Sequence, residues 1–271
     1  MTSSWKQRRA LTIIVAVELW APERVPAYAP MATAWPLPGY PDTHSTSWSE
    51  YGARAGIWRL LELLDSHGLP ATVGISGAVT QRFPDVVHAV QAAGHEIAAH
   101  SWTQDLVPAC LAQDEERRNI ERCTAAFREL TGDRPVGWIS PRASASTHTA
   151  RMLTEHGYLW SGDHADCDRP QVQATAAGPL VRMMHSEYSD VRDGGNPRAY
   201  LHTHHDLVDS LLAGEPGAST TITLHAHVSG RPVLARYADR VLAYVERHRD
   251  DLWITTYADL ARAVRGTEVA A

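Results

Sequence analysis

Three polar residues of this chain stand directly after short segments predicted to be strands, where they could act together in acid–base chemistry. Glu18 follows the apolar segment 11–17, His100 follows segment 96–99, and His225 follows segment 221–224, in which polar and apolar residues alternate. A carboxylate can take a proton from water, and an imidazolium can give a proton to a departing nitrogen. Hydrolysis of an amide-like carbon–nitrogen bond requires these two steps, so the residue types predict a hydrolase.

Two further residues, Arg142 and Asp163, would complete such a site. Arg142 comes shortly after the apolar segment 136–139 and could stabilise the oxyanion of a tetrahedral intermediate. A surface ion pair is an equally good explanation for this arginine. Asp163 offers a second carboxylate near the end of the next strand, with Asp166 and Asp168 as close alternatives.

The three leading residues also have competing interpretations. Glu18 could be a paired structural carboxylate, because an unpaired buried charge is costly. His100 could be a hydrogen-bonded core histidine. His227 lies two residues beyond His225 and faces the same side of an extended chain, so it would serve as well as His225.

The sequence predicts an incomplete metal site around His100. A second imidazole four residues later would give a familiar pair of ligands, but residue 104 is Gln. Glu18 and His100 would remain as two ligands, whereas catalytic zinc normally takes three from the protein. We therefore expect no cofactor, with a divalent metal such as zinc as the alternative. The histidines at 202, 204 and 205 are better explained as a solvated loop or helix start than as a metal tract.

Aromatic residues in and around a proline-rich segment could bind the substrate. Prolines exclude a long helix from residues 20–50, so we expect a long functional loop there that covers the site. Trp35 and three other tryptophans could gather at this mouth, where ring surfaces suit a small planar ureide, imide or N-acyl compound, and also sugars. The predicted substrate-binding residues are Trp20, Trp48, Trp102, Gln104 and Trp138. Packing of the loop is the alternative role for the tryptophans.

The elements that must position these residues alternate along the chain. We expect strands at 11–17, 71–75, 96–99, 136–139, 158–160, 221–224 and 252–255. We expect helices around 57–64, 84–93, 120–127, 150–155, 207–212, 234–245 and 260–264. Repeated strand–helix units predict parallel strands, and the ends of such strands meet on one face of a barrel. An open doubly wound sheet is the competitor, but no G-x-G-x-x-G motif follows the first strand.

Composition indicates one ordinary enzyme domain over residues 1–271. The net charge of -6 argues against partners such as nucleic acid or anionic membranes. The three cysteines lack metal-type spacing and are expected to be reduced in a cytoplasmic protein. Basic residues before segment 11–17 imitate a signal peptide, but Glu18 interrupts it. No apolar stretch is long enough to span a bilayer.

Several segments together resemble a known superfamily. They are residues 48–59, 68–72, 94–100, 134–138 and 224–232, together with Asp163 and the run 166–170. Over about residues 11–264 the chain resembles the polysaccharide deacetylase (NodB-homology, carbohydrate esterase 4-like) superfamily. Within it, the chain is most similar to the branch of metal-independent allantoinases, cyclic imide hydrolases and cytoplasmic peptidoglycan-deacetylase-like proteins. The resemblance implies a distorted (β/α) barrel that hydrolyses a carbon–nitrogen bond.

The resemblance also implies roles for individual residues. Metal-dependent members bind a divalent ion, often zinc, through a first-strand aspartate and two histidines of an H-[ST]-x-x-H motif. Here His100 and Ser101 match its first half, and Gln104 replaces the second histidine. Glu18 takes the place of either the catalytic base or the metal-binding carboxylate. His225 matches the late histidine that donates a proton.

The resulting expectation is a metal-independent hydrolase of a small amide, cyclic imide, ureide or N-acyl compound. Glu18 and His100 would activate water, Arg142 or a backbone N–H would stabilise the oxyanion, and His225 would protonate the leaving nitrogen. One alternative is a metal-dependent N-deacetylase of an amino sugar that recruits ligands such as His164, His185 or His227. The other is an inactive binding protein. The branch implies a homo-oligomer and a small-molecule substrate.

Overall fold

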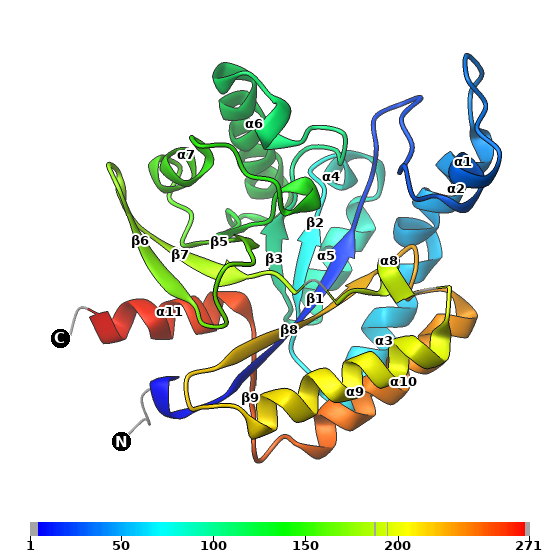
Figure 1. Cartoon of the computed structure of the whole chain (residues 1–271). Coiled ribbons are helices and arrows are strands. Elements are labelled where there is room, and N and C mark those ends of the chain that lie inside the picture. Colours follow the sequence, from blue (N-terminus) through cyan, green and yellow to red (C-terminus); the bar gives the residue numbers. More distant parts are fainter. Residues whose placement is uncertain (1–4, 187, 194, 269–271) are drawn as a thin grey trace.

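One curved β-sheet carries the fold in the computed structural model, which describes residues 5–186, 188–193 and 195–268 (Figure 1). Within these residues the sheet has nine strands in the order β6-β7-β5-β4-β3-β2-β1-β8, and β9 pairs with the beginning of β1. Neighbouring strands are parallel except β6 and β7, which form an antiparallel hairpin. The strands are β1 (Ala10–Val17), β2 (Thr72–Ile75), β3 (Glu96–Ala99), β4 (Gly137–Trp138), β5 (Trp160–His164), β6 (Gln171–Thr175), β7 (Gly178–Met184), β8 (Ser219–His225) and β9 (Trp253–Thr255).

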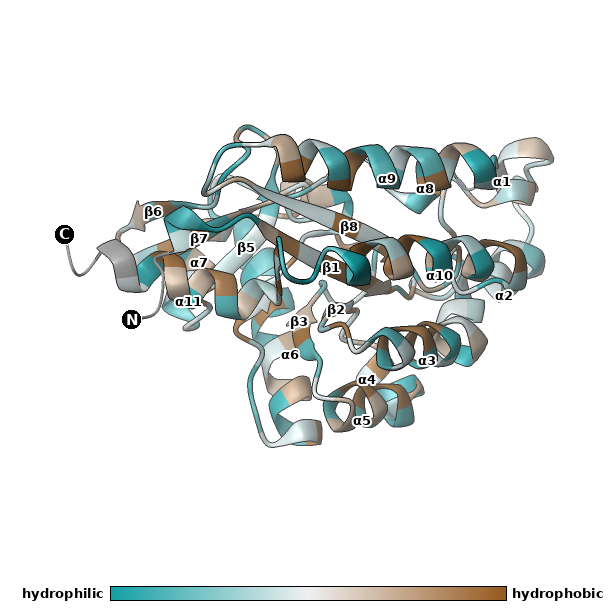
Figure 2. Ribbon diagram, turned by 90° about the horizontal axis from the view of Figure 1, so that it is seen from below, coloured by the Kyte–Doolittle hydropathy of each residue, from teal (hydrophilic) through white to brown (hydrophobic). Residues whose placement is uncertain are grey.

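Helices connect the parallel strands and pack against the sheet. The longer helices are α2 (Thr43–Tyr51), α3 (Ile57–His67), α5 (Pro84–Ala92), α6 (Gln113–Thr131), α7 (Thr149–Glu155), α9 (Pro197–Ala213), α10 (Pro232–Arg247) and α11 (Tyr257–Glu268). Short helices are α1 (Pro30–Ala34), α4 (Val79–Arg82) and α8 (Asp190–Asp193). Both α3 and α10 have an apolar side and a polar side, as Figure 2 shows, because their apolar residues recur at helical spacing.

Alternation along β1 divides the core in two. Leu11, Ile13 and Val15 pack in the larger cluster, which includes residues of α3, α5, α6 and α10. Ile14 points the other way, into a smaller cluster with Trp160 of β5 and residues of α11. Successive side chains of a strand face opposite sides, so Glu18 shares the inner face with Ile14. The Glu18 carboxylate, which follows the last residue of β1, therefore lies on the inner side of the curved sheet.

The sheet curls into a half-barrel, which confirms the predicted distorted (β/α) barrel. Among the described residues no ladder of hydrogen bonds joins β7 to β8, and one parallel bridge between Ser189 and Thr223 connects this side. This incomplete closure leaves a gap that α9 borders, since α9 packs against β8. The arrangement brings the ends of β1, β3 and β8 to one end of the curved sheet (Figure 1).

Several predicted elements differ from the structure. The segment 20–50 is not a continuous loop, because α1 lies within it and α2 begins after the last proline, where the Asp42 side chain accepts a hydrogen bond from the Ser45 backbone N–H at 2.9 Å. The strand predicted at 158–160 runs from Trp160 to His164, since its polar residues hide the strand pattern. The β6–β7 hairpin and the full length of α9 were not predicted.

None of the described helices combines the length and the apolar character that crossing a bilayer requires.

Candidate active site

The carboxylate of Glu18 lies at the centre of a buried cluster of rings. Its Oε1 atom is 3.2 Å from Nε2 of His100 and 4.0 Å from Nε2 of His225. The other oxygen accepts a hydrogen bond from the hydroxyl of Tyr28 at 3.1 Å and lies 3.8 Å from Nδ1 of His227. The structure therefore brings together the three residues that the sequence predicted to meet, and adds Tyr28 and His227 to them.

The histidines keep Glu18 ionised in spite of its burial. Burial alone opposes ionisation of the carboxyl group, which is only 6% exposed. The positive charge of His225 and the hydrogen bond with His100 outweigh this effect and lower the pKa of Glu18 to about 2. Glu18 is thus a carboxylate at neutral pH, and it can accept a proton.

His225 is paired with a buried carboxylate on its other side. Its Nδ1 atom lies 2.6 Å from Oδ1 of Asp190, and the Asp190 side chain is fully buried. The second oxygen of Asp190 accepts hydrogen bonds from Ser229 Oγ at 2.6 Å and from the His225 backbone N–H at 2.7 Å. Burial lowers the pKa of His225, but Asp190 and Glu18 outweigh it and raise the pKa to about 9. His225 is therefore an imidazolium at neutral pH, which can donate a proton.

His227 differs from His225 although the two rings are neighbours. Its ring is buried, with Nε2 3.1 Å from the Tyr28 hydroxyl and with Nδ1 lacking a hydrogen bond within the described residues. Burial lowers the pKa of His227 to about 4, because Glu18 raises it too little to compensate. The structure thus separates two histidines that the sequence left equivalent, since one faces Asp190 and the other does not.

The orientation of His100 is fixed by the neighbouring strand. Its Nδ1 atom lies 2.7 Å from the carbonyl oxygen of Ile139. A carbonyl oxygen only accepts hydrogen bonds, so Nδ1 carries a proton and Nε2 faces Glu18. The end of β4 therefore positions the imidazole at the end of β3.

A small cavity adjoins this cluster. Its volume is about 70 Å³, and its lining combines the polar cluster with small and apolar side chains of the inner sheet face. The lining residues are Ile14, Ala16, Glu18, Gly74, His100, Ile139, Ser140, Arg142, Ala143, His185, Thr223 and His225. A space of this size suits an amide or acyl group rather than a whole sugar chain.

Arg142 and Asp163 occupy different places. Arg142 borders the cavity from an exposed turn, where it and Ala143 have the positive φ angles of 59° and 48°. Asp163 does not line the cavity. Its Oδ1 accepts a hydrogen bond from the Ser140 backbone N–H at 2.7 Å, and its Oδ2 accepts one from Ser140 Oγ at 2.7 Å. Asp163 therefore lies behind the cavity wall, near enough to interact with the charge of His100, and its carboxylate holds the base of this turn.

Replacement of Asp163 by Ala should therefore destabilise the fold. The buried Ser140 N–H and hydroxyl would lose their acceptor, so we expect the free energy of unfolding to fall by about 2–3 kcal/mol. Urea denaturation measures this loss. The control Asp166→Ala removes an exposed carboxylate that pairs with Arg182, and we expect a change below about 1 kcal/mol. Equal losses in the two variants would contradict the role assigned to Asp163.

Gln104 and two of the predicted tryptophans also lie away from the cavity lining. The Gln104 amide donates hydrogen bonds to Ser76 Oγ and to the His100 carbonyl oxygen, both at 3.0 Å, so it ties strand ends together. Trp102 is buried in the core beneath the guanidinium of Arg122, which lies 3.5 Å from its ring centre. Trp138 is fully buried and donates to Ser140 Oγ at 3.0 Å. Their large apolar rings are more stable in the core than at the mouth.

The other predicted aromatics gather around His227. Trp20 and Trp48 contact the His227 ring edge-on, with centroid separations of 5.8 and 4.9 Å, and Tyr28 stacks on it at 5.9 Å. Trp35 is 71% exposed and takes no part. The segment after β1 thus covers one side of Glu18 with aromatic rings.

Several residues that could bind a metal ion are held by other partners. Within the residues that the structure describes, no group of three or more His, Cys, Asp or Glu side chains is arranged to hold one. Gln104 turns its amide away to Ser76, and His164 lies instead 3.0 Å from the Arg182 guanidinium. The segment 202–205, expected to be a solvated loop or a helix start, lies in the first half of α9, where His204 is buried and bonded to the Tyr200 carbonyl.

Sequence reasoning assigned no catalytic role to three residues of this site, although it named His185 as a possible metal ligand. Asp190 and His185 lie in the irregular part of the sequence between β7 and α9, and Tyr28 lies in the proline-rich segment. None belongs to a regular pattern that would reveal it. Only the fold brings Asp190 to His225, 35 positions away.

Acid should destabilise the protein through its buried neutral histidines. The pKa of His227 falls from 6.5 in the unfolded chain to about 4, so its contribution to stability is present above pH 6.5 and is lost as the pH falls towards 4. We expect urea denaturation at pH 7 and pH 5 to show a loss of about 2 kcal/mol from this residue. In His227→Gln the decrease should be smaller by that amount, and an unchanged pH dependence would contradict this interpretation.

The family relationship agrees with this geometry. Residues 47–160 match the family model described as "Polysaccharide deacetylase". A peptidoglycan deacetylase of Helicobacter pylori is 22% identical over 245 residues, which cover 76% of this chain and 82% of the relative. A chitooligosaccharide deacetylase of Sinorhizobium fredii is 27% identical and covers 57% of this chain and 73% of its own. The crystal structure of Puue allantoinase has a TM-score of 0.86 and 27% identity, covering 98% of this chain and 95% of that chain.

The half-barrel with a carboxylate and imidazoles at its strand ends is the arrangement of a hydrolase built on a distorted (β/α) barrel, and the similarities point to one superfamily. The match of residues 47–160 and the likeness to the solved structures support a relationship of this chain to the polysaccharide deacetylase (NodB-homology) superfamily. Its members are hydrolases that act on carbon–nitrogen bonds other than peptide bonds.

Proposed function

We propose that this protein hydrolyses the carbon–nitrogen bond of a small amide, cyclic imide, ureide or N-acyl compound without using a metal ion. One observation carries the proposal: the Glu18 carboxylate and the Asp190-paired imidazolium of His225 face each other across 4.0 Å beside a cavity of about 70 Å³. Glu18 as general base and His225 as general acid thus lie beside a space that fits the amide or acyl group to be cleaved.

The residues suggest the order of proton transfers. Water between Glu18 and the carbonyl carbon attacks that carbon, and Glu18 takes the proton that the water oxygen loses. The carbonyl oxygen becomes an oxyanion, which the Arg142 guanidinium stabilises from the cavity wall. The carbon–nitrogen bond then breaks as His225 Nε2 gives its proton to the nitrogen. Proton return from Glu18 to His225 restores both groups.

The low pKa of Glu18 suits this cycle. It makes the carboxylate a weak base, but the attacking water becomes a strong acid once its oxygen bonds to carbon. The proton then transfers readily to Glu18, which stays ionised and able to accept it at every pH near neutrality. The high pKa of His225 likewise keeps this histidine protonated at neutral pH, so it can act as the acid.

The small cavity and the aromatic cover support a compact substrate. Trp20, Tyr28 and Trp48 close the side of Glu18 that lies next to His227, which leaves little room for a polymer. The likeness to Puue allantoinase over nearly the whole chain is consistent with this choice. Similarity to the peptidoglycan and chitooligosaccharide deacetylases keeps an amino-sugar N-acetyl group as the second candidate.

A substrate panel with metal analysis tests the proposal. The panel contains allantoin, cyclic imides, N-formyl and N-acetyl amines, and N-acetylglucosamine. We expect turnover of at least one small compound, with equal rates before and after chelation and less than stoichiometric metal by elemental analysis. Deacetylation of N-acetylglucosamine that chelation abolishes would support the metal-dependent alternative. Binding without turnover across the panel would indicate an inactive binding protein.

A further inference from the structure

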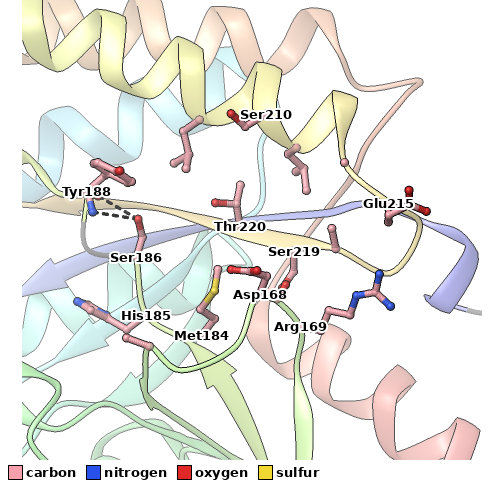
Figure 3. Close-up of a pocket in the computed structure, with 15 residues that line it drawn as sticks. Asp168, Arg169, Met184, His185, Ser186, Tyr188, Ser210, Glu215, Ser219 and Thr220 are labelled. Carbon is pink, nitrogen blue, oxygen red and sulfur yellow. Dashed lines mark hydrogen bonds between the residues drawn. The ribbon is translucent and has the colours of Figure 1, made fainter.

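A second and larger cavity lies where the half-barrel fails to close. Its volume is about 610 Å³, and it is bordered by β7 and the residues after it, by β8 and by the end of α9 (Figure 3). Its lining combines hydroxyl groups with an apolar helix face. The main contributors are Ser186, Ser210, Ser219 and Thr220, with Leu207 and Leu211.

His185 connects this cavity with the catalytic one. It lines both the larger cavity and the cavity of about 70 Å³ that contains Glu18 and His225. Its ring is mostly buried, and within the described residues its Nδ1 atom has no hydrogen-bond partner. A buried polar atom without a partner is unfavourable, so a substrate group that reached this nitrogen would be stabilised there. The two cavities therefore share His185 as a common lining residue.

We propose that the larger cavity binds the non-reacting, nitrogen-linked part of the substrate, while the bond to be cleaved lies in the smaller one. The inference rests on the proposed function and names its specificity pocket. The smaller cavity holds little more than an acyl or amide group, so any further part of the substrate needs another space. His185 hydrogen-bonds the substrate where it passes from one cavity to the other.

The lining indicates the kind of group that is bound. The hydroxyls and apolar side chains inside the cavity favour an uncharged ring or chain that carries hydroxyl or amide groups. Asp168, Arg169 and Glu215 are the exposed charged residues of the lining, and Figure 3 shows Arg169 and Glu215 at the end away from His185, with Asp168 nearer the middle. Two carboxylates against one guanidinium disfavour an anionic substituent there.

Three N-acetyl amines of the same reactivity test this pocket. They are N-acetylmethylamine, N-acetyl-4-hydroxycyclohexylamine and N-acetyl-4-carboxycyclohexylamine. In the wild type we expect kcat/KM for the hydroxyl compound to exceed that for the methyl compound by about tenfold or more, from burial of the ring. The carboxylate compound should lose most of this gain.

Two variants fill the larger cavity from opposite walls. Ser210→Phe does so from α9 and Thr220→Ile from β8, and each should reduce the tenfold ratio to below about twofold. His202→Phe is the matched control, because this exposed position of the same helix does not line the cavity, and its ratio should equal that of the wild type. A wild-type ratio near one, or an unchanged ratio in both filled variants, overturns the inference.

A binding measurement separates this inference from the proposed function. Calorimetry of the Glu18→Gln variant with the hydroxyl compound should show binding that the added Ser210→Phe change weakens about tenfold. If this result holds but none of the three amides is cleaved, the catalytic proposal fails and the pocket stands. If the methyl compound is cleaved but Ser210→Phe does not change the affinity for the hydroxyl compound, the proposed pocket is wrong and the catalytic proposal stands. If Ser210→Phe changes the oligomeric state but not the selectivity, the larger cavity is a contact surface for a second copy of the chain. That result would also overturn the inference that this cavity binds substrate.

Discussion

Substitution of Glu18 by Gln is expected to lower kcat/KM about 10³-fold, the largest effect of any single change in this site. The amide retains the volume of the side chain but cannot take a proton from water, and loss of a general base typically costs 10²–10⁴-fold. The change also removes the negative charge that helps to raise the pKa of His225, so the proton donor weakens as well. Steady-state kinetics with the best substrate of the panel measure the effect.

A second buried carboxylate provides the control for Glu18. Glu96 lies at the opposite end of the sheet, where it accepts hydrogen bonds from Thr72 Oγ1 at 2.7 Å and from Trp160 Nε1 and the Ala258 backbone N–H, both at 2.9 Å. Glu96→Gln should reduce stability but leave kcat/KM within about twofold of the wild type, because it acts only on packing and hydrogen bonds. Retention of more than a tenth of the activity in Glu18→Gln would refute the role of Glu18 as base.

Substitution of His225 by Asn is expected to lower kcat/KM about 10²–10³-fold for alkyl amides. Asn places an amide near the position of Nδ1, where it can still bond to Asp190, but it has no proton to give at the position of Nε2. A leaving group that departs without protonation needs no acid, so the loss should shrink to below about tenfold for 4-nitroacetanilide. Equal losses for the two leaving groups would contradict the role of His225 as acid.

Asp190 tests the same assignment through pH. Activity requires protonated His225, so wild-type kcat/KM should be constant below the raised pKa and fall as the pH rises through about 9. Asp190→Asn removes the charge that contributes most to this rise, and the decline should begin at a lower pH, with little loss near pH 6. Ser229→Ala leaves the Asp190–His225 pair intact and should barely move the profile. If the decline of kcat/KM at high pH begins at the same pH in Asp190→Asn as in the wild type, a group other than His225 controls it.

Periodicity explains why much of the framework could be predicted. The predicted segments became β1, β2, β3 and β8 within a residue or two. The long apolar run of β1 reflects burial on both faces, whereas polar and apolar residues alternate along β8. The segments between β5 and β8 could not be predicted as well. The hairpin β6–β7 lies at the edge of the sheet and is partly exposed, so its residues need no regular apolar pattern.

The sequence by itself determined which end of the sheet carries the chemistry. Glu18, His100 and His225 each follow a strand, and parallel strands bring their ends together, so the convergence of these residues follows from the order of elements. The same reasoning failed for Asp163, Gln104, Trp102 and Trp138. A strand end specifies a neighbourhood of several residues, but the direction of each side chain depends on which hydrogen bonds and packing partners are nearest.

Only the tertiary structure decided the charges of the site. His225 and His227 are two positions apart in the sequence, yet one is an imidazolium and the other is neutral. The difference arises because Asp190 arrives from a distant segment and pairs with one ring alone. A protonation state depends on the field of all nearby charges and on burial, and both are properties of the folded chain rather than of local sequence.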